Sequence, residues 1–397
     1  GEKQVIVQEK NIGLRRHILF CGGLSSQHDG VILLEDDLYV SPGYYQYAQR
    51  AAQYYRESQA ISGIALYSPR FNECARLPFY PLDDGVDVFF MQVACSWGQL
   101  WLKRQWEEFA SWYAENAGIE LGNDSTLPFE IRQWPESSWK KYFIKYLIVT
   151  NTFFVYPRFS LATNFGDLGE HHTGTSLHQV PLFFGGKENV QFVDFSQSVV
   201  KYDAFCEIIP ETLSRLCPHL DGADFVVDLY GIKERHCFTK SHVLTSRSCT
   251  NYLQSFGRRL IPIEYNIVDA ISGNFLFFSH VKDVQDVDET DFRKYIYTKC
   301  ATIEEQMYFY NISNLHYFIM NKEIKKYKSM YSMGQAKINE LMKVVCNVQA
   351  DLAETKNSLS QSMKNIDLIR KSFSYQIGQK IIYPFSLIKK NIMNKGK

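Results

Sequence analysis

The sequence lacks any excess of charge, because its 43 basic side chains balance 43 acidic ones. A general nucleic-acid binder needs a concentrated positive field, so this balance argues against that class. The nine cysteines include no C-x-x-C pair, which argues against a structural zinc site and against a disulfide framework. No uninterrupted apolar run reaches the roughly 18 to 20 residues that span a bilayer. We therefore expect a protein of the reducing cytoplasm.

The first part of the chain alternates between strand and helix patterns. Short apolar runs predict strands at residues 5–7, 31–34 and 61–67, and the run at 31–34 is typical of a strand buried on both faces. Capping signals predict helices over about 12–24 and 41–58, the second of which begins with the pair Ser-Pro. This alternation predicts an α/β fold with a parallel sheet and right-handed crossovers.

The rest of the chain divides into three further regions. Residues 187–330 read as a second α/β region, with strands expected in "DFVVDLYG" and near "NFLFFSHV". A coiled-coil helix is expected over 331–373, and a basic amphipathic tail over 374–397. The tail contains five lysines and no acid between bulky apolar residues, which favours a peripheral contact with the inner face of the membrane. A solvated basic tail is the alternative.

The coiled-coil prediction depends on a regular spacing. The residues at its positions are apolar except for Thr355 and Ser362, and the positions are 338, 341, 345, 348, 352, 355, 359, 362, 366, 369 and 373. Alternate steps of three and four are typical of a coiled-coil seam, so we expect a homo-oligomer through 338–373. An amphipathic helix that packs back on its own domain has the same pattern, and this alternative stays open.

Three consecutive acids, Glu35, Asp36 and Asp37, follow the aliphatic run at 31–34. In an open parallel sheet, ligands bind outside the carboxyl ends of the strands. Side chains alternate along an extended chain, so we expect Glu35 and Asp37 on one side and Asp36 on the other. Two such carboxylates repel by roughly 3 kcal/mol, and Mg²⁺ or Mn²⁺ shared with a diphosphate would offset this. An acidic loop that stabilises the N-terminus of the next helix is the alternative.

Six segments, in order and spacing, resemble GT-A-fold glycosyltransferases related to N-acetylglucosaminyltransferase I. The segments are "NIGLRRHILF", "VILLEDDLYVSPGYYQY", "AISGIALYSPRFNE", "SWGQLW", "YPRFSLATNFGDLGEHHTG" and "DLYG". The resemblance implies a GT-A domain over 1–186, with a Rossmann-like parallel or mixed sheet. Family members begin with a strand and loop that bind the nucleotide base, so we expect this chain to lack its first βα unit.

On the donor side, the resemblance implies that Asp37 holds the metal and that Asp36, with Glu35, contacts the nucleotide sugar. His172, in the glycine-bearing loop, would close over the diphosphate or its metal. Arg15, near the start of the first helix, would be a further diphosphate contact. The alternative for Arg15 is an exposed arginine on a helix surface, and the alternative for His172 is a surface or core residue without a functional role.

On the acceptor side, the resemblance implies an apolar wall formed by Trp97 and Trp101, although frequent aromatic residues are more often part of the core. Related enzymes place an aspartate, the general base, directly after a tryptophan that lies 18 residues before the proline of Y-P. Here Trp139 has that position, and Lys140 follows it. A protonated lysine cannot accept the acceptor's proton. Glu136 is the nearest substitute carboxylate and is our candidate for the catalytic base.

The sequence therefore predicts a metal-dependent glycosyltransferase. It would move a sugar from a nucleotide-diphosphate donor to a glycan or lipid-linked acceptor in surface polysaccharide biosynthesis, with inversion. A nucleotidyltransferase of similar fold is one alternative. A coiled-coil assembly protein whose transfer domain has decayed is another, and Lys140 favours it.

Overall fold

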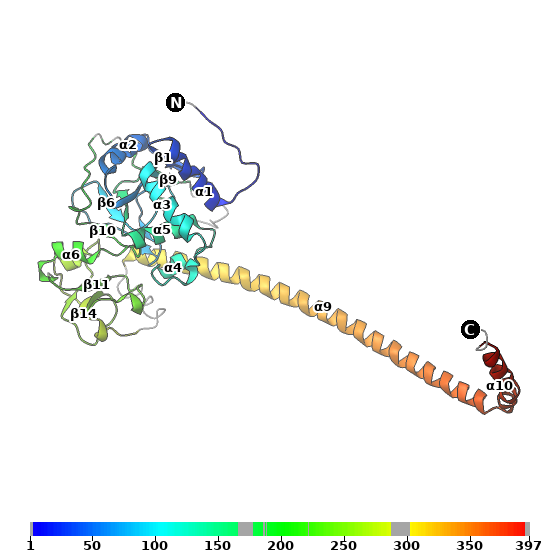
Figure 1. The fold of residues 1–397 in the computed structure, drawn as a ribbon. Helices are drawn as coiled ribbons and strands as arrows, with labels where there is room; N and C mark the ends of the chain where they lie inside the picture. Colours follow the sequence, from blue (N-terminus) through cyan, green and yellow to red (C-terminus); the bar gives the residue numbers. More distant parts are fainter. Residues whose placement is uncertain are drawn as a thin grey trace. The chain divides into compact units, whose positions relative to one another are not determined.

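The computed structural model describes residues 3–165, 178–185, 187, 189–220, 222–286 and 302–393 (Figure 1). The chain divides into two compact units, Gly1–Ile312 and Ser313–Lys397. The first unit is a mixed α/β structure with two main sheets, and the second is helical. An α/β class is therefore confirmed.

The larger sheet has six strands in the order β1-β7-β3-β8-β6-β10. In that order the strands are Gly30–Leu33, Gln99–Leu102, Ile61–Ala65, Phe153–Pro157, Val88–Met91 and Lys201–Tyr202. The sheet is mixed, because only β3 with β8 and β6 with β10 pair in parallel. The wholly parallel sheet expected from the strand–helix alternation is wrong, since the antiparallel strand β7 lies between β1 and β3, whereas the sheet is mixed, as the resemblance also allowed. The sheet also continues past residue 186, through β10.

Strand direction decides which ends meet. Strand β7 is antiparallel to both β1 and β3, so β1 and β3 point the same way, and β8 is parallel to β3. The carboxyl ends of β1, β3 and β8 therefore share one edge of the sheet. Beyond β1, the strand β2 (Leu38–Val40) pairs with β9 (Ala162–Asn164), and the Phe165 N–H donates to the Asp37 carbonyl at 3.0 Å.

Helices cover both faces of this sheet. The helices α1 (Leu14–Gly23), α3 (Lys103–Asn116) and α5 (Trp139–Thr150) contact one another and share one hydrophobic core. The helix α2 (Tyr44–Tyr55) belongs to a second core. On β8, Phe154 and Tyr156 lie in the first core, whereas Phe153 and Val155 lie in the second, because successive side chains in a strand point to opposite faces. Both helices expected near the N-terminus are thus present, in shorter form.

Residues 5–7 form no strand. Val5 and Val7 are 71% and 82% exposed, and no strand among the described residues pairs with them. A short apolar run favours a strand only where a sheet edge is available, so the prediction there is wrong.

The smaller sheet has the order β11-β12-β14-β13, and its first two strands are parallel. In that order the strands are Phe225–Asp228, His242–Thr245, Leu276–His280 and Gln254–Phe256. The expected strands in "DFVVDLYG" and "NFLFFSHV" are confirmed as β11 and β14. Besides five short 3-10 helices, the other described elements of the first unit are β4 (Phe71–Asn72), β5 (Leu77–Pro78), α4 (Phe129–Arg132), α6 (Pro210–Leu216) and α7 (Tyr265–Val268).

Buried charges join the loop after β10 to the smaller sheet. The Lys233 Nζ lies 2.5 Å from Asp203 Oδ2, and the Arg247 Nε lies 3.1 Å from Asp228 Oδ2. The Glu207 carboxylate accepts the backbone N–H groups of Leu229 and Tyr230, at 3.1 and 3.0 Å. Each charge has a partner, which keeps the cost of burying it low.

The second unit consists of most of α9 (Ile303–Lys371) and of α10 (Phe373–Met393), separated by a bend at Ser372. The helix predicted over the seam is thus present up to that bend. Among the described residues, no helix is long and apolar enough to cross a membrane.

Candidate functional site

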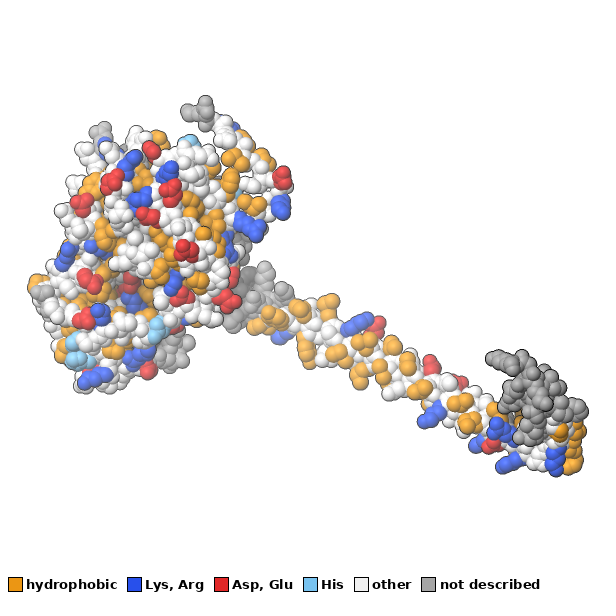
Figure 2. Space-filling view, viewed as in Figure 1, with side chains coloured by type: hydrophobic (Ala, Val, Ile, Leu, Met, Phe, Trp, Pro, Cys, Tyr) orange, Lys and Arg blue, Asp and Glu red, His pale blue; other side chains and the backbone are white. Residues whose placement is uncertain are grey.

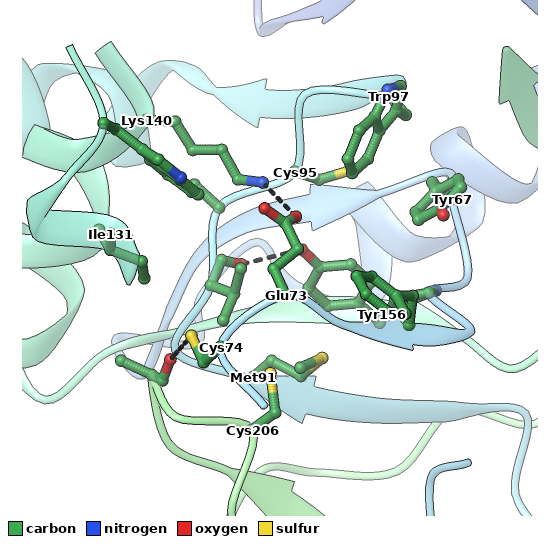
Figure 3. A pocket seen from close by; sticks show the side chains of 16 residues that line it. Tyr67, Glu73, Cys74, Met91, Cys95, Trp97, Ile131, Lys140, Tyr156 and Cys206 are labelled. Carbon is green, nitrogen blue, oxygen red and sulfur yellow. Dashed lines mark hydrogen bonds and ion pairs between the residues drawn. The ribbon is translucent and has the colours of Figure 1, made fainter. Parts of the chain in front are cut away.

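A cavity of about 40 Å³ opens near the edge where β1, β3 and β8 end (Figure 3). Aromatic and sulfur-containing side chains line most of it, and two charged side chains, Glu73 and Lys140, face each other across it. This volume holds a water molecule or two and is too small for a whole sugar. The cavity can therefore be only the inner end of a binding site.

The Glu73–Lys140 pair is the charged centre of this cavity. The Lys140 Nζ lies 3.4 Å from Glu73 Oε1, and it also lies 4.9 and 5.1 Å from the ring centroids of Trp97 and Trp134. Burial by itself would raise the pKa of the Glu73 carboxyl, but the charges of Lys140 and His178 outweigh burial and lower this pKa below its usual value. Glu73 is therefore an ionised carboxylate at neutral pH, inside an aromatic frame.

The two charges come from elements far apart in the sequence. Lys140 lies in the first turn of α5, whose start is fixed by the Ser138 hydroxyl, which accepts the Lys141 N–H at 3.3 Å. Glu73 lies in the turn between β4 and β5, where the Asn72 side chain accepts the backbone N–H groups of Cys74 and Ala75. Local hydrogen bonds thus hold both backbones in place.

Trp97 enters the cavity from the loop that leads into β7. The next residue, Gly98, has a φ of +89°, and a Cβ there would lie 3.1 Å from the Ala162 Cβ, so the turn favours glycine. The Trp97 ring is half-buried. It stacks on the His178 ring with 4.5 Å between the ring centroids, and its centroid lies 5.0 Å from that of Tyr67. Its position at the cavity agrees with the expected role in an acceptor wall.

Trp101 lies elsewhere. It has no exposed surface and packs on Trp106, Trp139 and Phe143 in the core. A sugar needs an accessible ring face on which to stack, so the expected acceptor contact by Trp101 does not fit the structure. Trp101 is therefore a residue of the hydrophobic core.

The run of acids lies directly after β1, at the same edge of the sheet. Asp36 and Asp37 are exposed and form a turn in which the Leu38 N–H donates to the Glu35 carbonyl at 3.3 Å. The strict alternation of an extended chain, which we expected, therefore does not apply. Burial, then Asp37 and Asp36, raise the pKa of Glu35 to about 7, whereas Lys140 lowers it. The charge of Lys140 thus acts on Glu35 through space, although no ion pair joins these two side chains among the described residues.

The donor set suits a hard divalent cation that the protein shares with a ligand. Within the described part of the chain, no Lys or Arg pairs with these three carboxylates, and no group of three or more His, Cys, Asp or Glu side chains is arranged to hold a metal. Magnesium and manganese are commonly bound by one or two carboxylates, with phosphate oxygens and water as the other ligands. Burial is the main cause of the raised pKa of Glu35, and such an ion would relieve the further part that comes from Asp37 and Asp36.

The other predicted residues lie outside the cavity lining. The Arg15 guanidinium lies over the Tyr142 ring at 4.9 Å and donates to the Glu136 carbonyl. The Glu136 carboxylate accepts from Lys141 Nζ at 2.9 Å, and its side chain is 55% exposed. His172 falls outside the described residues. The structure therefore places Trp97 in the cavity lining and the three acids beyond β1, outside that lining, whereas Arg15 and Glu136 form a separate contact.

Sequence reasoning missed Glu73 and Trp134. Glu73 is the last residue of the segment "AISGIALYSPRFNE", and the unexpected cation at Lys140 was a signal that a carboxylate should lie nearby. Nothing in the local pattern marks Trp134.

Comparison with known proteins does not assign this chain to a family. No protein-family model matches the chain, and no curated protein matches it significantly. The chemistry of the site therefore has to support the functional conclusion.

Proposed function

We propose that this chain is a metal-dependent, inverting glycosyltransferase of the GT-A fold. It moves a sugar from a nucleotide-diphosphate donor to a hydroxyl of a glycan or lipid-linked acceptor, in surface polysaccharide biosynthesis. The observation that supports this most is the ion pair of Glu73 and Lys140, which lies in an aromatic cavity near the sheet edge where the acidic turn follows β1. The acidic turn suits a metal and diphosphate, and the cavity contains an ionised carboxylate and a tryptophan.

On the donor side, Asp37 would hold Mn²⁺ or Mg²⁺, and Asp36 and Glu35 would contact the nucleotide sugar. The backbone of Asp37 is fixed by the bond from the Phe165 N–H, while its side chain is exposed. When bound, the ion would neutralise the diphosphate leaving group as a Lewis acid.

On the acceptor side, we assign the general base to Glu73. The acceptor oxygen forms a bond to the anomeric carbon, the bond from that carbon to the diphosphate breaks, and the hydroxyl proton passes to the Glu73 carboxylate. Lys140 occupies the place of the aspartate expected from the resemblance, but it holds a carboxylate 3.4 Å away, so an acid is still available. Glu136 remains the alternative base, although Lys141 and solvent surround it.

Calorimetry tests the donor side. Mn²⁺ is titrated first, followed by pyrophosphate and a panel of nucleoside diphosphates. We expect diphosphate binding that requires Mn²⁺ and is lost in Asp37→Ala. Asp29→Ala is the matched control, because Asp29 is exposed before the other end of β1. Binding that is the same in both variants, or that needs no metal, would contradict the proposal. Preference for a nucleoside triphosphate with a sugar phosphate would favour the nucleotidyltransferase.

Release of nucleoside diphosphate from the bound donor tests the base. We expect Glu73→Gln to lower this rate by about 10²- to 10⁴-fold, the usual contribution of a positioned general base. Glu136→Gln is the control and should retain the wild-type rate. The reverse result would transfer the role to Glu136. No release by any form of the chain would favour the decayed assembly protein.

A further inference from the structure

The second unit exposes a row of large apolar side chains along α9, seen as orange groups in Figure 2. Its side chains are half or more exposed, for example Leu352 at 66%, Leu359 at 61% and Ile366 at 50%. Monomeric proteins rarely leave such a row of large apolar side chains in water, so a partner surface is expected.

The period of the row identifies the partner as another helix. With Ile338 at position a, the a and d positions of successive heptads coincide with the seam from 338 to 373. A straight α-helix has 3.6 residues per turn, so a strict seven-residue repeat stays on one face only when two helices supercoil around each other. A flat sheet or a globular groove would not require this period over five heptads.

The polar positions in the seam indicate how the helices align. Thr355 and Ser362 occupy two successive d positions among aliphatic neighbours. In a parallel, in-register pair each hydroxyl meets its own copy and can exchange a hydrogen bond with it. In an antiparallel pair the hydroxyls would face aliphatic residues, and in a parallel pair shifted by one heptad only one Thr355 would meet a Ser362 while the other two hydroxyls would lose their partners, which is unfavourable.

The flanking charges agree with this alignment. Asp351 is at position g and Lys356 is at the following position e, and these positions face each other across a parallel pair. No like charges meet at the other e and g positions of the seam. In an antiparallel pair that overlaps the full seam, Asp351 would instead lie near Ser358 or Asn365, which are uncharged.

We propose that the seam binds a second copy of this chain as a parallel, in-register, two-stranded coiled coil. The proposal does not depend on the catalytic function, since every residue that supports it lies in the second unit.

Light scattering on the full chain tests the association. We expect twice the mass of the 46.2-kDa chain for the wild type, and a single-chain mass for Leu352→Asp with Leu359→Asp. Leu368→Asp is the matched control, because Leu368 is 68% exposed but lies outside the seam, and it should stay dimeric. Circular dichroism and thermal melting report whether the first unit remains folded in each variant. A monomeric or trimeric wild type would overturn the proposal.

Cross-linking tests the alignment. In a parallel, in-register dimer Thr355→Cys places two thiols side by side, and we expect a covalent dimer on oxidation. Cys346 is exposed but lies at position b, so the wild type should give no such product. Failure of Thr355→Cys to cross-link in a confirmed dimer would overturn the parallel register.

Discussion

The Glu73–Lys140 pair gives the sharpest prediction about the site. Lys140→Met removes the ammonium and keeps most of the side-chain length, and Glu73→Gln removes the negative charge with little change in size. We expect each single change to destabilise the protein, because each leaves a charge in an aromatic cavity without its partner. The double variant should lose less stability than the sum of the two single variants.

The geometry sets the size of this coupling. Two unit charges 3.4 Å apart interact by about 5 kcal/mol at an effective dielectric constant of about 20. The side chains of Lys140 and Glu73 are 11% and 30% exposed, so solvent screens part of this energy. We therefore expect a coupling free energy of about 1 to 3 kcal/mol, between the values typical of exposed and of fully buried pairs.

Urea unfolding of the four forms at neutral pH measures this coupling in a double-mutant cycle. The lowered pKa of Glu73 also makes the stability contributed by the Glu73–Lys140 pair depend on pH. Its stabilising effect is present above the ordinary glutamate pKa of 4.5 and is lost as the pH falls through the lower pKa of the folded state. The coupling should therefore disappear in acid. A coupling below about 0.3 kcal/mol at neutral pH, the range of simple additivity, would refute this account of the site.

Three further predictions concern the scaffold that positions the site. Burial raises the pKa of Glu264 to about 7, so the folded state binds this proton more tightly than the unfolded chain does. The wild type should lose about 3 kcal/mol of stability as the pH rises from 4.5 to 7, and Glu264→Gln should lack that slope in urea titrations at several pH values. Trp101→Ala removes a fully buried ring and should cost about 3 to 5 kcal/mol, and a cost typical of a surface residue would contradict the core assignment. Arg247→Met leaves Asp228 buried without its cation and should cost about 3 to 5 kcal/mol at neutral pH; recovery in the double variant with Asp228→Asn would be the check on this cause.

The elements with strong local signals could be predicted from the sequence. Residues 31–34 contain four aliphatic side chains, and burial on both faces of a sheet follows from that pattern. The full burial of β3, and the helices after both strands, agree with such patterns, but β1 is only partly buried, because it lies at the side of the sheet, and Leu34 is exposed. The run at 5–7 has a similar composition, but no sheet edge reaches it, and so it forms no strand.

The order of strands could not be predicted in the same way. Strand β7 is inserted between β1 and β3 from a position more than thirty residues further along the chain than β3, by hydrogen bonds that no local pattern encodes. This insertion makes the sheet mixed, while it leaves β1 and β3 pointing the same way. The acids after β1 therefore still lie at the expected edge of the sheet, although the strand next to β1 is β7 and not a parallel strand.

The sequence by itself determined the features that depend on spacing along one element: the acidic turn after a strand, the helices, and the seven-residue repeat of α9. Only the tertiary structure decided which distant side chains share the cavity. It placed Glu73 beside Lys140, 67 residues further along the chain, and it buried Trp101 away from solvent. The physical reason is that periodicity records which face of an element is apolar, whereas the pairing of charges depends on how the chain closes loops of many residues to bring separate elements together.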